Sequence, residues 1–471
     1  MAYDYDLIVI GMGPAGMAVS AMASEMGLKV CAIEKHRIGG ECMNVGCIPS
    51  KSLLRIANYR SSPLKLHKMG LADLPRPDIA QPFNRIQQYL EFIRDKKTIK
   101  MFDKVHLVYQ KGPANFVDPH TVRVAEEIYT AKRIFICIGT GPEVPQFEGI
   151  DQVGYLTNEN IFELDAVPES LIVVGGGAIA CEMAQAFARL GSKVTIVIRG
   201  PRLIWREDRD ATDLLEKIFE AEGITILREH TPVGFEKQGS RVLMRTDKES
   251  TVIAEKVLVA TGRRHWYAQL ELENAGVETD RRGAIKIDNF LRTSQRHIYA
   301  PGDCNGHYLF SHAAMHQGMV ALMNSMAPRF FKMRFSKFPV PWTVFTEPQF
   351  SRVGLSEKEL KEKGIKYEVV QTNYGDYGAA IAEGVEDGFI KAFIGKTGRI
   401  YGVYIIGENS GELINEWALA IQNKLPIYKI LMQQHSFPTM GFLTKRIAET
   451  WMMNRMKSNL LKKVCQLMYR F

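Results

Sequence analysis

The sequence of 471 residues has no apolar run long enough to cross a membrane as a helix, which takes about 20 residues. It also has no leader-like start, because Asp4 and Asp6 precede the first apolar stretch. Internal repeats and low-complexity segments are absent as well. These absences favour a cytoplasmic globular protein, and at roughly 150 residues per domain the length indicates about three domains.

Cysteine is scarce, and the seven cysteines are an odd number scattered along the chain. This pattern does not match a disulfide-stabilised secreted protein and favours a reducing compartment. Only Cys42 and Cys47 stand close together, so we expect this pair alone to cycle between dithiol and disulfide. We expect packed free thiols at Cys31, Cys137, Cys181 and Cys304.

Acidic residues are scarce near the C-terminus. Residues 445–471 carry seven basic residues and one acidic residue, so this tail holds +6 of the formal net charge of +8. On one helix an apolar stripe would form from Met453, Met456, Leu460, Val464, Leu467 and Phe471. We expect this stripe to pack on the preceding domain up to about Lys457, and the remainder suits docking on an anionic membrane surface or on a partner. No nucleic-acid-binding fold is indicated, so no nucleic-acid partner is expected.

The N-terminal segment predicts a dinucleotide-binding βαβ unit. A strand over residues 7–10 precedes a glycine-rich loop, a helix through residue 26 and a strand over residues 29–33. The loop glycines are Gly11, Gly13 and Gly16. The first two let the backbone approach a pyrophosphate, and the third allows close packing of helix and strand. Glu34, after the second strand, is placed for ribose hydroxyls.

A second unit of the same kind starts with a strand over residues 171–174, followed by Gly175, Gly177 and Ala180. Two such units in one chain indicate a flavin in the first and a nicotinamide in the second. The second unit ends at residue 198 without an acid. Arg199 and Arg202 follow instead, and guanidinium groups there favour NADPH over NADH. The alternative is that these arginines belong to a solvated loop.

The dithiol follows the first unit directly, in the run of residues 39–51 that reads GGECMNVGCIPSK. A thiol pair with four residues between its members, at the first turn of a helix, has a lowered thiolate pKa and suits disulfide exchange. Its position beside the expected flavin indicates electron transfer.

These features resemble the flavoprotein pyridine nucleotide-disulfide oxidoreductases, the group of glutathione reductase, dihydrolipoamide dehydrogenase and mercuric reductase. The resemblance extends to residues 137–142, 260–263, 298–303 and 344–349 and covers essentially the whole chain. It implies an α/β fold with two doubly wound dinucleotide-binding domains and a C-terminal α+β dimerisation domain. The implied boundaries are residues 1–150 (FAD-binding), 151–280 (NAD(P)-binding), 281–338 (FAD-binding return), 339–444 (dimerisation) and 445–471 (basic amphipathic helix).

The resemblance also implies roles for single residues. NADPH would reduce FAD, and reduced FAD would open a Cys42–Cys47 disulfide, with Cys47 facing the flavin and Cys42 exchanging with the acceptor. Lys51 and Glu182 match an ion pair beside the flavin that stabilises arriving negative charge. Further residues implied at the cofactors are Gly40, Gly139, Gly262 and Asp303, and no metal ligands are expected.

One segment departs from the family pattern. Disulfide reductases of this group carry His-x-His-Pro-Thr followed by an acid, and the second His, from the partner subunit, acts as acid and base. Residues 435–439 read HSFPT, so Phe437 replaces that base and Phe442 replaces the acid. Acceptors that need proton transfer should lose on the order of 10²-fold to 10⁴-fold in rate. We expect His435 to be bonded in the core, and His312 and His316 to make packing or polar contacts.

The sequence therefore predicts a homodimeric oxidoreductase that passes electrons from NADPH through FAD and the dithiol to a metal ion, a quinone or a protein disulfide. Mercuric reductases share an Arg at the place of Arg199, but they end in a vicinal cysteine pair, and this tail has Cys465 alone. Two alternatives stay open. One is a dihydrolipoamide dehydrogenase-like enzyme with impaired proton transfer, and the other is a slow flavin redox sensor or scaffold that docks through its basic tail.

Overall fold

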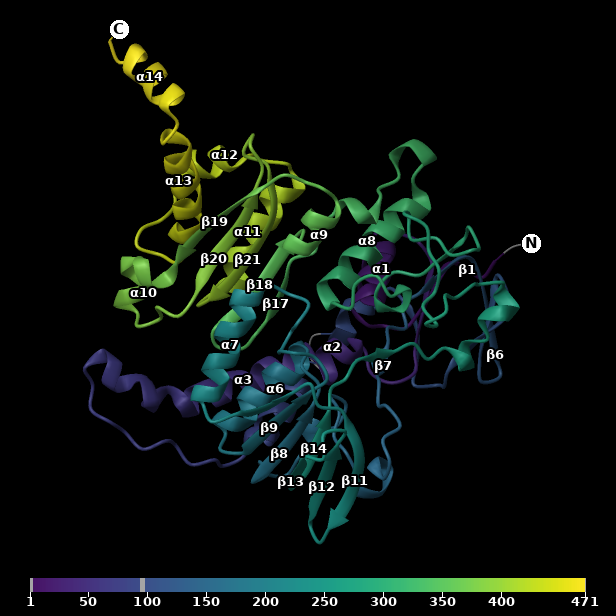
Figure 1. Cartoon of the computed structure of the whole chain (residues 1–471). Helices are drawn as coiled ribbons and strands as arrows, with labels where there is room; N and C mark the ends of the chain where they lie inside the picture. The colour runs from purple at the N-terminus through teal and green to yellow at the C-terminus, as the bar shows by residue number, and fades with distance from the viewer. Residues whose placement is uncertain (1–2, 94–97, 471) are drawn as a thin grey trace.

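The computed structural model describes residues 3–93 and 98–470, and its three large sheets each form the centre of one unit of the fold (Figure 1). The sheet of the first unit has the strand order β3-β2-β1-β6-β5-β4, and β16 also pairs with β6. Its strands are β1 (Tyr5–Ile10), β2 (Val30–Glu34), β3 (His106–Tyr109), β4 (Ala114–Asp118), β5 (Thr121–Val124), β6 (Glu127–Ile136) and β16 (Ile298–Tyr299). Strands β1, β2 and the end of β6 run parallel and are rich in buried Ile, Leu and Val, as strands inside an α/β layer are.

Two helices far apart in the sequence complete the first unit. Helix α1 (Pro14–Glu25) packs against α8 (Ser311–Met326). The pairing of β16 with β6 likewise brings residues near 300 back to the first sheet after the chain has built the second unit. The flavin-type fingerprint therefore lies beside a segment that follows it by almost 300 residues in the chain.

The second unit contains a parallel sheet of strand order β10-β9-β8-β14. Its elements are β8 (Ser170–Val174), α6 (Ala178–Arg189), β9 (Lys193–Ile198), α7 (Arg209–Ala221), β10 (Thr225–Arg228) and β14 (Lys256–Val259). A meander of β11 (Pro232–Gln238), β12 (Arg241–Thr246) and β13 (Thr251–Ala254) adjoins it. The chain passes between the two units at β7 (Gly141–Pro142) and β15 (Arg263–Arg264), which pair with each other. Both predicted βαβ units are thus confirmed to within two residues at their element ends.

The third unit is an antiparallel sheet of strand order β17-β18-β21-β20-β19. These strands are β17 (Trp342–Val344), β18 (Gln349–Gly354), β19 (Glu368–Asn373), β20 (Phe389–Ile394) and β21 (Ile400–Gly407). Helix α11 (Ser410–Gln422) packs on β18 and β21, and its Trp417 is fully buried in the core of this unit. The predicted order of two doubly wound units followed by an α+β unit is confirmed.

The C-terminal segment differs from the single amphipathic helix that the sequence suggests. Helix α13 (Phe442–Met456) ends before Ser458, whose backbone is extended, and a separate helix α14 (Asn459–Met468) follows. Ser and Asn favour helix starts over helix interiors, which explains the break. Helix α13 packs on the third unit through Leu443, Ile447 and Trp451. Helix α14 projects away from the fold (Figure 1), and Phe471 lies outside the described residues.

In the part of the chain that the structure describes, no helix is both long enough and apolar enough to cross a membrane.

Candidate active site

A cavity of about 2080 Å³ lies where the first and second units meet. Both glycine-rich loops, the dithiol run and Asp303 line it. The remaining residues predicted at the cofactors also line this cavity, except for Gly16, which is buried behind the first loop. The sequence fingerprints and the family motifs therefore converge on one space.

The first loop is shaped by close backbone contacts. Gly11 has φ +91°, and a Cβ there would lie 2.7 Å from the carbonyl oxygen of Cys137, so Gly11 is required by the turn itself. A Cβ on Gly16 would lie 1.8 Å from the carbonyl oxygen of Gly11. Gly13 is different, because a Cβ there would meet only the Cα of Gly40, at 4.0 Å. Gly13 at the start of α1 is thus the glycine that leaves room for a phosphate.

Glu34 is buried at the end of β2 and lines the cavity. Its carboxylate accepts hydrogen bonds from the backbone N–H of Met12 at 2.8 Å and of His36 at 2.7 Å. These bonds fix the carboxylate beside the glycine loop, where the family fingerprint holds ribose hydroxyls. The glycine cradle and this carboxylate together fit the adenosine diphosphate half of FAD.

The second loop repeats this design with one change. Gly175 has φ +125°, and a Cβ there would lie 2.3 Å from the carbonyl oxygen of Ala260. A Cβ on Gly177 would meet no atom within 4 Å, so this glycine leaves open space at the start of α6. Ala180, fully buried, stands where the first unit needs Gly16. The second loop therefore has the same open phosphate position with a looser helix contact.

In the second unit, arginines stand after strand β9, where the first unit has the acid Glu34 after β2. Arg199, Arg202 and Arg206 all line the cavity, and among the described residues no carboxylate forms an ion pair with any of them. The Nε of Arg202 is buried without a hydrogen-bond partner. The neighbouring acid Glu207 is not available, because it pairs with Arg352 at 2.9 Å. Unpaired guanidinium groups at this position fit a phosphate on the nicotinamide cofactor.

The dithiol joins two helices. Cys42 lies in α2 (Gly40–Asn44), and Cys47 is the first residue of α3 (Cys47–Ser61), where the positive helix end favours a thiolate. The Cys42 thiol donates a hydrogen bond to the Cys47 sulfur, which lowers the pKa of Cys47 and raises that of Cys42. Ser311 Oγ, 3.3 Å from Cys47 Sγ, and the charge of Lys51 lower the pKa of Cys47 further, whereas burial opposes them. These effects favour a thiolate on Cys47 and a protonated thiol on Cys42 when the pair is reduced.

Lys51, one turn after Cys47, pairs with Glu182 of α6, and its Nζ lies 2.8 Å from Oε2. The Glu182 side chain is 5% exposed and also accepts a hydrogen bond from the backbone N–H of Phe345 at 3.0 Å. The Phe345 ring lies under the Lys51 ammonium at 4.5 Å. This ion pair connects the dithiol helix to the second unit, and a buried carboxylate with these partners keeps the lysine charge beside Cys47.

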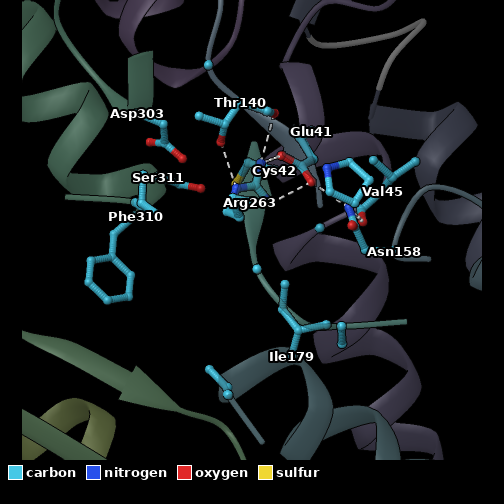
Figure 2. Close-up of a pocket in the computed structure, with 18 of the residues that line it drawn as sticks. Glu41, Cys42, Val45, Thr140, Asn158, Ile179, Arg263, Asp303, Phe310 and Ser311 are labelled. Carbon is cyan, nitrogen blue, oxygen red and sulfur yellow. Dashed lines mark hydrogen bonds and ion pairs between the residues drawn. The ribbon is translucent and has the colours of Figure 1, made fainter. Parts of the chain in front are cut away.

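Sequence reasoning did not find the network around Glu41. Arg263 forms a two-pronged ion pair with the Glu41 carboxylate and donates from Nε to Thr140 Oγ1 at 2.7 Å (Figure 2). Asn158 of the second unit donates to the same carboxylate and to the carbonyl oxygen of Val45. The Glu41 carboxylate, next to Cys42 in the chain, is thus held by Arg263 and Asn158. The only sequence signal was a charged residue next to Cys42.

Three further residues that are predicted at the cofactors line the cavity nearby. Gly139 has φ +67° with no atom within 4 Å of a Cβ, and a Cβ on Gly262 would lie 3.1 Å from Glu143 Oε2. Asp303 begins a short helix just before α8 and lies with Ser311 to one side of the Arg263 network (Figure 2). Burial raises the pKa of Asp303, and the charge of Arg263 counteracts this. The group fits the polar chain of a flavin cofactor.

The segment that departs from the family pattern lies in the third unit. The His435 side chain is 6% exposed and bonds to Glu416, with 3.1 Å between Nε2 and Oε1, which agrees with its expected structural role. Phe437 is 70% exposed and contacts the Phe442 ring edge-on at 5.4 Å between centroids. His312 bonds to the Pro341 carbonyl and His316 packs on Phe338, as expected. The four thiols predicted to be packed are all buried.

Comparison with known proteins agrees with this architecture. The family model described as pyridine nucleotide-disulphide oxidoreductase matches residues 5–318, and the dimerisation-domain model of the same family matches residues 340–446. The chain is 32% identical over 431 residues to mercuric reductase of Staphylococcus aureus, covering 90% of this chain and 78% of that protein. It is 32% identical over 456 residues to dihydrolipoyl dehydrogenase of Thermus scotoductus, covering 93% and 95%.

Solved structures give the same result. The chain matches the HOCl-induced flavoprotein disulfide reductase RclA from Escherichia coli with a TM-score of 0.85 and 27% identity, covering 95% of this chain and all of that one. A Cu(II) complex of RclA matches with the same TM-score and identity.

Proposed function

The chain belongs to the pyridine nucleotide-disulphide oxidoreductase family, and from this premise we propose that it passes electrons from NADPH, through FAD and the Cys42–Cys47 pair, to a non-standard acceptor. Membership makes it an NAD(P)H-dependent, FAD-containing disulfide oxidoreductase. Two observations together carry the proposal. The Cys47 thiolate is stabilised beside the Lys51–Glu182 ion pair, and Phe437 stands where the family has its catalytic base.

The two glycine loops would hold the two cofactors. Gly11, Gly13, Gly16 and Glu34 would bind the FAD diphosphate and ribose, with Gly40, Gly139, Gly262 and Asp303 along its remainder. Gly175 and Gly177 would bind the nicotinamide cofactor, and Arg199 and Arg202 its 2′-phosphate. Bound FAD supplies a centre that accepts hydride and returns two electrons to a disulfide.

The side chains around the dithiol would hold charge and protons in fixed places. Cys47 carries the thiolate, stabilised by the start of α3, Ser311 and Lys51. Cys42 keeps its proton because its pKa is raised, and its hydrogen bond to Cys47 orients it. Glu182 holds Lys51 in place from the second unit. This arrangement favours Cys47 as the flavin-side sulfur and Cys42 as the exchange thiol.

A metal ion is the acceptor that the comparisons favour among a metal ion, a quinone and a protein disulfide. The relatives include mercuric reductases, and RclA was solved with Cu(II). Closing the pair, one thiolate and one thiol, to a disulfide releases two electrons and the one proton of Cys42, and one Hg(II) reduced to Hg(0) or two Cu(II) reduced to Cu(I) would take up the two electrons. Soft metals bind thiolates directly. Such an acceptor does not need a base at Phe437.

An acceptor screen on purified protein tests this proposal. NADPH and NADH would be compared with Cu(II), Hg(II), quinones, lipoamide and protein disulfides. We expect one acceptor class to dominate with NADPH, and its reduction to vanish in the Cys42→Ser variant. Equal, feeble turnover with every acceptor would instead favour the flavin redox sensor or scaffold.

A dihydrolipoamide dehydrogenase-like activity is the second candidate, because such enzymes are also among the relatives. The missing base is expected to cost lipoamide turnover on the order of 10²-fold. If this candidate is right, Phe437→His should recover much of that loss. If lipoamide turnover does not rise, proton transfer was not the limit. Phe442→Asp in the same background would supply the orienting acid as a control.

The assembly and location of the protein are further parts of the proposal. The dimerisation-domain match supports a homodimer, which light scattering would test. The free buried thiols suit a reducing cytoplasm. Helix α14 carries Lys462 and Lys463 beside the exposed Leu467, which suits contact with an anionic membrane. Vesicle binding with and without residues 458–471 tests that contact, and equal binding would refute it.

A further inference from the structure

A second cavity, of about 620 Å³, opens on the first unit away from the dithiol. Its charged lining residues are all basic and come from β6, the segment before β16 and the segment after α8. The basic residues are Lys132, Arg133, Arg292, Arg296 and Lys332. Electron transfer between the cofactors and the dithiol uses none of them, so this cavity calls for a separate explanation.

The positive charge of this cavity is only partly balanced. Lys132 pairs with Asp6 at 3.0 Å and Arg292 pairs with Asp288 at 2.6 Å. Among the described residues, no carboxylate pairs with the other three basic residues, Arg133, Arg296 and Lys332. Burial and the charges of Arg292 and Arg133 lower the pKa of Lys332. Cations held this close without enough counter-charge favour binding of an anion.

Two exposed aromatic residues stand directly beside the cavity. Residues 326–328 and Lys332 line it, so residues 329–331 extend beyond its rim. These three residues form a short 3-10 helix with no buried side chain. Phe330 is 95% exposed and Phe331 is 77% exposed, and Met326 at the start of the segment is also exposed. Two adjacent phenyl rings are unusual in water without a binding partner, because burying one Phe side chain completely is favourable by about 2 kcal/mol.

We propose that residues 326–332 and the adjoining basic cavity form a docking surface for an anionic phospholipid membrane, with Phe330 and Phe331 entering the interface and the cavity taking a phosphate headgroup. Aromatic insertion and basic attraction are the two signals that reversible membrane binding requires together. The charge of the surface matches that of the lipid, and the apolar tip matches the boundary below the headgroups. This contact lies on the first unit and is separate from helix α14 (Figure 1).

Vesicle co-sedimentation of the full-length FAD-loaded protein tests the proposal. We expect binding to phosphatidylcholine vesicles that contain phosphatidylglycerol, little binding to phosphatidylcholine alone, and weakening with salt. Phe330→Ser with Phe331→Ser should reduce the affinity on the order of tenfold or more. Lys332→Glu and Arg296→Glu should each reduce it roughly fivefold or more. Matched controls on the second unit are Ile253→Ser and Lys237→Glu, both at exposed positions, and these should bind like the wild type.

Three results would overturn the proposal. One is wild-type binding by the Phe330 and Phe331 variant. Another is binding that disappears with Lys462→Glu and Lys463→Glu in α14 but not with changes at residues 326–332. The third is a change of oligomeric state in the Phe330 and Phe331 variant, which would make this surface a contact between subunits. NADPH oxidation is measured on the same samples, so failure of the redox proposal stays distinguishable from failure of membrane docking.

Discussion

The two dinucleotide-binding units share one backbone design and differ where they meet the ligand. In both, the first glycine of the loop has a positive φ and the second leaves open space at a helix start. In the first unit, β2 ends at Glu34, which is held by two backbone N–H groups. In the second unit, β9 is followed by Arg199, with no acid beside it. The repeated backbone provides a phosphate cradle, and the residue after the second strand determines which sugar group is recognised.

Substitutions at the third position of each glycine-rich loop should give the largest difference in unfolding free energy between the two units. Gly16→Ala would place a Cβ 1.8 Å from the Gly11 carbonyl oxygen, so we expect a loss of about 3 kcal/mol in unfolding free energy and poor FAD retention. Ala180→Gly at the equivalent place should cost only about 1 kcal/mol. Denaturant titrations and the flavin absorbance of purified protein measure both. Equal stability of Gly16→Ala and wild type would show that the first loop is as loosely packed as the second.

The arginines of the second unit should determine the preference for NADPH over NADH. Replacing Arg199 and Arg202 together by Ala should lower kcat/KM for NADPH on the order of 10²-fold, because two charge-assisted hydrogen bonds to phosphate are lost. NADH has no 2′-phosphate, so its kcat/KM serves as the internal control and should change little. Parallel losses for both cofactors would mean that these arginines support the loop without reading the phosphate.

The ion pair that connects the units should control the thiolate. With Lys51→Met we expect the pKa of Cys47 to rise and the NADPH-driven rate to fall roughly tenfold. In the wild type the pKa of Cys47 is lowered, so alkylation of the reduced enzyme should persist below the pH at which an ordinary cysteine loses its thiolate. Iodoacetamide rates against pH measure this.

A control is needed because Lys51→Met leaves the buried Glu182 carboxylate unpaired. Lys51→Met combined with Glu182→Gln removes both charges and should recover stability without recovering the lowered pKa. An unchanged alkylation profile in both variants would assign the lowered pKa to the start of α3, the Cys42 thiol and Ser311.

The open glycine of the second loop should give the smallest effect. Gly177→Ala meets no atom of the chain within 4 Å and its φ is −83°, so the unfolding free energy should stay within about 0.5 kcal/mol of wild type. The added methyl group would stand where the pyrophosphate approaches, and KM for NADPH should rise several-fold with kcat unchanged. A fall in stability with no change in KM would contradict this assignment.

The sequence alone determined the two βαβ units, their order and the position of the dithiol between them. These features depend on residues close together in the chain, such as Gly11 to Glu34, whose local backbone needs are visible as a pattern. It also determined that Phe437 cannot act as a base, since that follows from the side chain itself. The end of the tail was predicted less well, because a stripe of apolar residues does not reveal the break at Ser458.

Only the tertiary structure decided which charged residues far apart in the chain lie close together. Glu41 and Arg263 are 222 residues apart in sequence, and their ion pair exists because β15 crosses back beside α2. The basic cavity likewise combines residues from β6, the approach to β16 and the segment after α8. Electrostatic contacts depend on distance in space, and a charged residue in a sequence carries no mark of its eventual partner.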